Sequence, residues 1–363
     1  MENYIPCDIG FVERKNIDFS LFNVLLEKSI SNNRVSNFGP VSKELESELS
    51  LLNGIDSLQS NFKAICGSSA TLLISAVAAA LDNRYQTSLR WAVCDFGFFT
   101  NFTGPVKTAS KVKCNSAGML DIDQLALLPD DSFDVVMVTN VFGWHDDFED
   151  YFRFCRQKNK ILIVDNAAGF GSLANRHMNS EPGLAPEWIE IVSLHHTKPW
   201  GFGEGGVAFA DSELVKYIAA ALNFGISPEI VLEDSRWVSN GKMSEVAAAA
   251  IMCRVRDRQN WVSQYRDQTH RIMNLACKAG LVPLSNDLPS RHVVGQIGFL
   301  SKRPVSRHEI DASILPLEKY YRPTVGFGSG AMNIYNHMIN IPTHASMSFF
   351  SDETIINELK CLL

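Results

Sequence analysis

The 363-residue sequence lacks several patterns that identify whole classes of protein. It contains no basic run, and its net charge is −7, which argues against a nucleic-acid partner. Its eight cysteines are scattered without a C-x-x-C pair, as is typical of reduced thiols in the cytoplasm. No apolar stretch approaches the roughly 20 residues that span a bilayer, and charged residues interrupt the first positions where a signal peptide would be apolar. We therefore predict a cytoplasmic protein without a membrane span.

The composition is that of a globular chain, with 46% hydrophobic and 20% charged residues, long enough for two lobes. Strands and helices alternate to about residue 215, which predicts an α/β fold with a doubly wound sheet. Beyond it we predict one long helix over 244–265 and a small α/β lobe that closes with a helix over 352–363. The predicted strands are 62–66, 91–99, 135–139, 160–164, 189–194, 207–210, 293–300 and 339–341, and the predicted domains are 1–238 (large) and 239–363 (small, C-terminal).

The most informative stretch is 193–206, which lies between two predicted strands and carries Lys198 followed by four glycines within eight positions. A lysine at a buried strand end loses hydration, which lowers its pKa and makes its amine a better nucleophile for a carbonyl. Glycines let the backbone approach a bulky ligand. A solvated lysine in a glycine-rich turn is the simpler alternative.

Two other interpretations of this stretch fail. Gly201, Gly203 and Gly206 match G-x-G-x-x-G, but a dinucleotide fingerprint must open a helix, and this one runs into a predicted strand. His195 and His196 are adjacent, so their side chains alternate in an extended chain and cannot chelate one metal together. We therefore predict neither a dinucleotide site nor a metal site here.

Polar residues end two further predicted strands. Gly67, Ser68 and Ser69 lie between a strand and a helix, where backbone N–H groups and hydroxyls suit a phosphate, although either serine could serve only as the N-cap. Asp165 ends a strand of apolar residues, and a buried carboxylate needs a cationic partner unless turn amides satisfy it. In open α/β sheets this edge is where ligands bind.

Several segments, in order, carry a resemblance to one family. Segment 193–206 is close to Ser-Phe-His-Pro-Thr-Lys-Asn-Leu-Gly-x-Gly-Glu-Gly-Gly, 163–171 is similar to Ile-Glu-Asp-Ala-Ala-Gln-Ala-x-Gly, and 65–70 resembles a Ser-Gly-Thr-x-Ala loop. Weaker likenesses occur at 37–41, 96–98, 240–245 and 341–344. Together they resemble the DegT/DnrJ/EryC1/StrS aminotransferases, pyridoxal-phosphate (PLP) enzymes of the aspartate-aminotransferase fold (fold type I) with a mostly parallel seven-stranded sheet and a small C-terminal α/β domain.

The resemblance implies a role for each matched residue. Lys198 would attach PLP covalently and move a proton, and Asp165 would pair with the pyridinium nitrogen. Phe98 would stack on the ring, and Asn240 would reach the phosphate from the neighbouring subunit, which implies a homodimer with shared active sites. The substrates would be an amino-acid donor, glutamate, and a nucleotide-linked keto sugar, as in polysaccharide biosynthesis. The phosphate would be held by Gly67, Ser68 and Ser193.

The chain also departs from the family pattern. Ala168 stands where the family has a glutamine near the ring hydroxyl, and Pro199-Trp200 replaces Asn-Leu. We expect Asn166, His195 or His196, or a water molecule, to replace the missing hydrogen bond. Two alternatives to a transaminase stay open: a PLP-dependent sugar dehydratase or lyase, and a non-catalytic homologue of the same fold.

Overall fold

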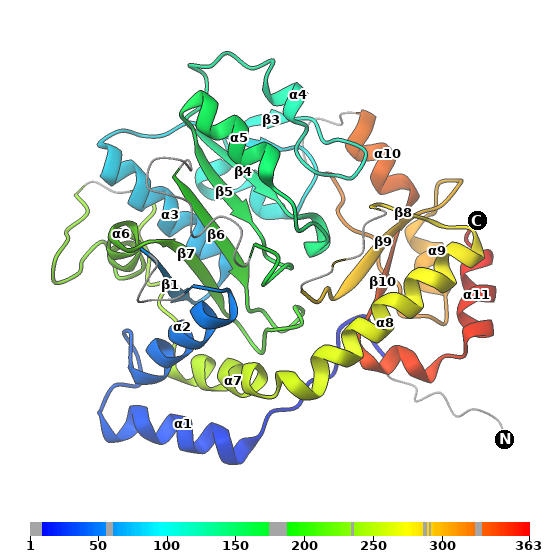
Figure 1. Cartoon of the computed structure of the whole chain (residues 1–363), viewed down its shortest axis with the longest axis horizontal. Coiled ribbons are helices and arrows are strands. Elements are labelled where there is room, and N and C mark those ends of the chain that lie inside the picture. Colours follow the sequence, from blue (N-terminus) through cyan, green and yellow to red (C-terminus); the bar gives the residue numbers. More distant parts are fainter. Residues whose placement is uncertain are drawn as a thin grey trace.

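The structure is a computed structural model that describes residues 9–55, 61–173, 187–233, 236–285, 289, 292–323 and 329–363. Its centre is a seven-stranded sheet of order β1-β7-β6-β5-β4-β2-β3 (Figure 1). All neighbouring strands are parallel except β7, which is antiparallel to both β1 and β6. The strands are β1 (Phe62–Gly67), β2 (Trp91–Cys94), β3 (Ser110–Val112), β4 (Val135–Thr139), β5 (Ile161–Asp165), β6 (Trp188–Ser193) and β7 (Gly206–Asp211).

Helices cover both faces of this sheet, which is why its strands are apolar on both sides. One face packs against α3 and α6, and the other against α2, α5 and α7. Helix α1 lies against α2 and α7 at the edge of this layer. The helices are α1 (Phe19–Ser31), α2 (Pro40–Leu52), α3 (Ala70–Tyr85), α4 (Ile122–Leu125), α5 (Glu149–Lys158), α6 (Ser212–Leu222) and α7 (Glu245–Arg256).

A second, antiparallel sheet of order β10-β9-β8 packs against α8 and α11 around its own apolar core (Figure 1). Helix α7 follows the predicted domain boundary at 238/239 but packs into the core of the large sheet, whereas α8 packs into the core of the small one. The boundary itself stays a prediction. No helix in the described ranges is both long and apolar enough to span a membrane. The elements here are α8 (Arg258–Ala279), β8 (Val282–Pro283), β9 (Gln296–Leu300), α9 (Arg307–Ala312), α10 (Ser329–His337), β10 (Met338–Pro342) and α11 (Asp352–Lys360).

One sequence prediction about these helices is wrong. The predicted single helix 244–265 is broken at Asp257, whose φ and ψ are −77° and 1°. The Asp257 carboxylate accepts a hydrogen bond from the Asn260 side chain at 2.5 Å, a local contact that aspartate favours at the ends of helices. At the start of α2, Gly39 is the N-cap residue and Pro40 occupies the first helical position, where proline is favoured.

The strand predicted over 91–99 is also too long. Strand β2 ends at Cys94, and the chain turns through Gly97 before a short 3-10 helix begins at Phe99. The turn carries Phe98 to the edge of the sheet where β4, β5 and β6 also end. This edge holds the candidate site.

Candidate active site

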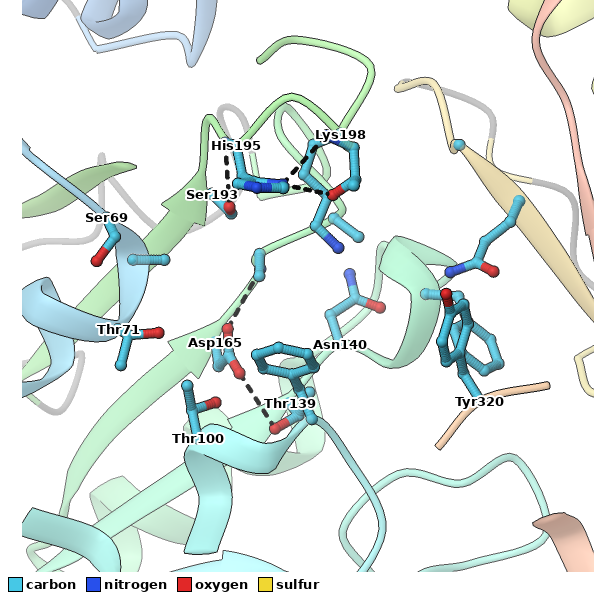
Figure 2. A pocket seen from close by; sticks show the side chains of 18 of the residues that line it. Ser69, Thr71, Thr100, Thr139, Asn140, Asp165, Ser193, His195, Lys198 and Tyr320 are labelled. Atoms are coloured by element: carbon cyan, nitrogen blue, oxygen red, sulfur yellow. Dashed lines mark hydrogen bonds between the residues drawn. The ribbon is translucent and has the colours of Figure 1, made fainter. Parts of the chain in front are cut away.

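A cavity of about 370 Å³ lies at the carboxyl ends of the parallel strands. It is walled by the end of β4, the end of β5, the loop after β6 and the start of α3, and residues of the second sheet close its far side (Figure 2). Ligands in open α/β sheets bind at this kind of edge.

Lys198 reaches this cavity from the turn after β6. Burial lowers the pKa of its amine, and the Asp165 charge opposes that fall. An amine with a lowered pKa carries a larger neutral, nucleophilic fraction near pH 7. The place of Lys198 in the cavity wall and its lowered pKa are those that the predicted activated lysine requires.

Asp165 approaches the cavity from a different wall, and Figure 2 shows both side chains facing the same space. The residue is 3% exposed, and from the described residues its carboxylate accepts two long hydrogen bonds, from Ala167 N at 3.3 Å and Thr139 Oγ1 at 3.5 Å. Burial raises its pKa to about 6 from an ordinary 3.8, while those two bonds and Lys198 oppose the rise. A cationic N–H donor placed here would therefore stabilise the ionised carboxylate.

The start of α3 forms a third wall through Ser69, Ala70 and Thr71. Ser69 is the N-cap, with its hydroxyl accepting from Leu72 N, so the first N–H groups of a 16-residue helix face the cavity. A Cβ at Gly206 would lie 2.6 Å from Ala70 N, so only glycine lets β7 begin this close to the helix start. The Ser68 hydroxyl is buried without a hydrogen-bond partner among the described residues. An anion would suit this wall.

The structure brings most, but not all, of the predicted site residues into the cavity wall. Phe98, 53% exposed, and Ser193 line it together with Lys198 and Asp165. Gly67 and Ser68 lie directly behind the wall: Ser68 N donates to Gly241 O at 2.7 Å, and Gly67 bridges to Lys242. Asn240 is exposed and outside this chain's cavity.

The sequence model of the DegT/DnrJ/EryC1/StrS aminotransferase family matches residues 116–310, more than half of the chain and including both Asp165 and Lys198. The chain belongs to this family.

Three individual relatives add detail. The protein Rv3402c of Mycobacterium tuberculosis is 32% identical over 116 residues, which cover 31% of this chain and only 27% of that protein's length. A PLP-dependent aminotransferase from Bacillus cereus superposes with a TM-score of 0.77 at 18% identity, over 98% of this chain and 99% of that one. DesI, crystallised with its TDP-sugar product, superposes with a TM-score of 0.73 at 19% identity, over 98% of this chain and 93% of that one. These structures confirm the predicted fold class.

The departures from the family pattern have structural explanations. Ala168 lines the cavity, so nothing larger stands where the family has its glutamine. Trp200 does not line it; its ring packs edge-on against Phe170 at 4.8 Å and Trp261 at 4.9 Å, so it is part of the core. Pro199 does line the cavity, and a Cβ added at Gly295 would lie 3.3 Å from Pro199 Cδ.

The expected replacements for the glutamine are partly wrong. The Asn166 amide is committed elsewhere: its Nδ2 donates to Gly169 O, Ser172 Oγ and Glu190 Oε1. His196 lies outside the cavity wall, with its ring against Phe202. His195 remains, since it lines the cavity, and its Nδ1 lies 2.9 Å from Thr197 Oγ1.

Sequence reasoning missed the far wall of the cavity. Tyr321 stacks on Phe142 with centroids 5.2 Å apart, and burial raises the pKa of its hydroxyl. The buried side-chain oxygen of Gln296 has no hydrogen-bond partner among the described residues. No local pattern marks these residues, because they come from three segments that are distant in the chain from Lys198: Phe11, Val12, Gln296, Tyr320 and Tyr321.

Proposed function

We propose that this protein is a PLP-dependent aminotransferase that moves an amino group from an amino acid, glutamate, to a keto sugar on a nucleotide. The observation that carries the proposal is that a buried, weakly bonded carboxylate, Asp165, and the amine of the half-buried Lys198 face one cavity. The nearby α3 N-terminus supplies the anion site that a phosphate requires.

The residues present fit the cofactor in three places. The amides at the start of α3 and the Ser69 and Ser193 hydroxyls would hold the phosphate, with Gly67 and the unpartnered Ser68 hydroxyl directly behind them. Asp165 holds the protonated ring nitrogen, which gives its buried charge the partner it lacks among the described residues. Phe98 covers the ring face. Asn240 of a second copy completes the phosphate site, so the working unit is a cytoplasmic homodimer.

Bound PLP supplies a carbonyl for the amino group and an electron sink for the Cα–H bond. Lys198 would hold the cofactor through its Nζ, and its amine would move a proton to and from the substrate Cα. Burial lowers the pKa of that amine, which increases its neutral fraction near pH 7. The carboxylate of Asp165 keeps the ring nitrogen protonated, and Phe98 and Tyr321 exclude water from the ring.

The sugar substrate is supported by the family and by DesI, which shares the fold and was crystallised with a TDP-sugar product. The aromatic far wall of the cavity, made by Phe142, Tyr320 and Tyr321, offers flat apolar surfaces of the kind that pack against sugar rings. A place in polysaccharide biosynthesis is proposed on the same family membership.

The test is reductive trapping followed by single turnover. Borohydride should fix the cofactor to Lys198, as peptide mapping by mass spectrometry will report, and glutamate should discharge the cofactor in one turnover. Lys198→Ala should abolish trapping. Lys111→Ala is the matched control, because Lys111 is also a partly buried lysine whose pKa burial lowers, to about 8, but it does not line the cavity. A label on another lysine would refute the mechanism, and a fully loaded protein that no amino donor discharges would identify a non-catalytic homologue.

A further inference from the structure

The turn that carries Lys198 is held from behind by two buried cations that lie outside the cavity wall. Lys15, 8% exposed, donates from its Nζ to His196 O at 2.7 Å, to Gly201 O at 2.8 Å and to Lys198 O. Arg254, 4% exposed, donates from Nε to Pro199 O at 2.9 Å. Four carbonyl oxygens within six residues are therefore bonded to two side chains from distant parts of the chain.

These cations have their own support. Arg254 Nη2 lies 2.7 Å from Glu13 Oε2, and the Tyr265 hydroxyl donates to the same oxygen at 3.0 Å. The Arg254 guanidinium lies 4.0 Å from the centre of the Trp261 ring. Burial and the charges of Arg254 and Lys198 lower the pKa of Lys15 to about 7, while the Glu13 charge opposes the fall. The three carbonyl acceptors also favour the charged form of the amine.

Both cations belong to segments that pass beneath the turn. Lys15 lies on the N-terminal segment before α1, and Arg254 lies in the last turn of α7 (Figure 1). The same N-terminal segment contributes Phe11 and Val12 to the cavity wall. The segment therefore contacts the cavity and, separately, the rear of the lysine turn.

The turn has little freedom once these bonds are made. Inside it, Lys198 N donates to His195 O at 2.9 Å, and Gly201 N donates to Lys198 O at 3.0 Å. A Cβ at Gly201 would overlap the carbonyl oxygens of Leu194 and His195, so the turn is as tight as glycine allows. With its carbonyls bonded on one side, the Lys198 side chain leaves on the other, toward the cavity.

We propose that Lys15 and Arg254 are positioning residues that fix the turn 195–201 so that the Lys198 amine faces Asp165. Neither side chain lines the cavity, so they act through the backbone of the turn. Hydrogen bonds from charged donors are stronger than neutral ones, and small displacements of a reacting group are costly. The effect on cofactor attachment rests on the proposed function, whereas the effect on the turn does not.

The experiment compares Lys15→Met, Lys15→Arg and wild type, with Lys158→Met as the matched control because Lys158 is an exposed lysine at the end of α5. The first measurement is amide hydrogen exchange in cofactor-free protein. Lys15→Met should speed exchange at residues 196, 198 and 201 by about tenfold or more, because the loss of even one of its three charge-assisted hydrogen bonds gives about that ratio. Exchange in β9 and β10 should not change.

The second measurement is the rate at which added PLP becomes trapped on Lys198 by borohydride. We expect about a tenfold slower rate in Lys15→Met, with recovery in Lys15→Arg and no change in Lys158→Met. If Lys15→Met does not fold, Arg254→Lys provides the same two comparisons, because its shorter side chain loses the bond to Pro199 O.

The outcomes separate the two proposals. Unchanged exchange in the turn of a folded variant, or faster exchange spread evenly over the whole protein, would overturn the positioning role. If wild type traps no cofactor at all while the turn still loosens in Lys15→Met, the proposed function fails and the positioning of the turn stands.

Discussion

Glu190 is a fully buried carboxyl group in β6, directly behind the active-site edge of the sheet. It is 0% exposed and accepts hydrogen bonds from Asn53 Nδ2 at 2.7 Å and Asn166 Nδ2 at 2.5 Å, with no cation bonded to it among the described residues. Burial raises its pKa to about 7 from an ordinary 4.5, and the two amides oppose the rise. We predict that Glu190→Gln changes how the stability of the protein depends on pH.

The sign follows from the raised pKa. The folded state binds the proton more tightly than the unfolded state, so the contribution of Glu190 is full below pH 4.5 and is lost as the pH rises through about 7. Between about pH 5 and pH 8 this loss amounts to roughly 2–3 kcal/mol of unfolding free energy, which a neutral glutamine does not suffer.

The glutamine in Glu190→Gln can be hydrogen-bonded after a small local rearrangement. The Asn53 side-chain oxygen is buried without a partner among the described residues, so rotation of the Asn53 amide would present it to the new glutamine N–H. Any constant cost of that rotation cancels when the same variant is compared at two pH values.

The assay is urea unfolding followed by tryptophan fluorescence at about pH 5 and pH 8, at one protein concentration. Glu190→Gln should gain stability over wild type by roughly 2–3 kcal/mol more at the higher pH. Glu27→Gln, which removes a carboxylate from an exposed position of α1, should show no such gain. Equal pH dependence in wild type and Glu190→Gln would refute the burial argument.

Two further predictions concern the active site. Asp165→Asn should keep the fold, since the two side chains have the same shape, but lower the single-turnover rate with glutamate by about 10² or more, because the charge opposite the ring nitrogen is lost; a full rate would show that Asp165 does not hold that nitrogen. Mixing Lys198→Ala with Asn240→Ala subunits should restore part of the activity by forming hybrid dimers with one intact site, and no recovery in subunits that demonstrably exchange would indicate that each site is built from one chain.

The sequence by itself determined the central elements and the two reacting groups. Apolar β-branched runs placed β4, β5 and β6 correctly, because a short continuous run of this kind is typical of a parallel strand that is buried on both faces. Asp165 and Lys198 stood out because a charged residue at the end of such a run loses hydration, which costs free energy unless a partner of opposite charge compensates it. That both face one cavity follows from parallel strands that end at the same edge.

Only the tertiary structure decided what surrounds those groups. Lys15, Gln296 and Tyr321 reach the site or its rear from segments far apart in the chain, and no local periodicity encodes such contacts. The break between α7 and α8 lies at Asp257, within a stretch of good helix formers that does not mark it. Asn166 illustrates the limit of reasoning from position alone: it follows Asp165 directly, yet alternation along the chain turns its amide away from the cavity and onto Glu190.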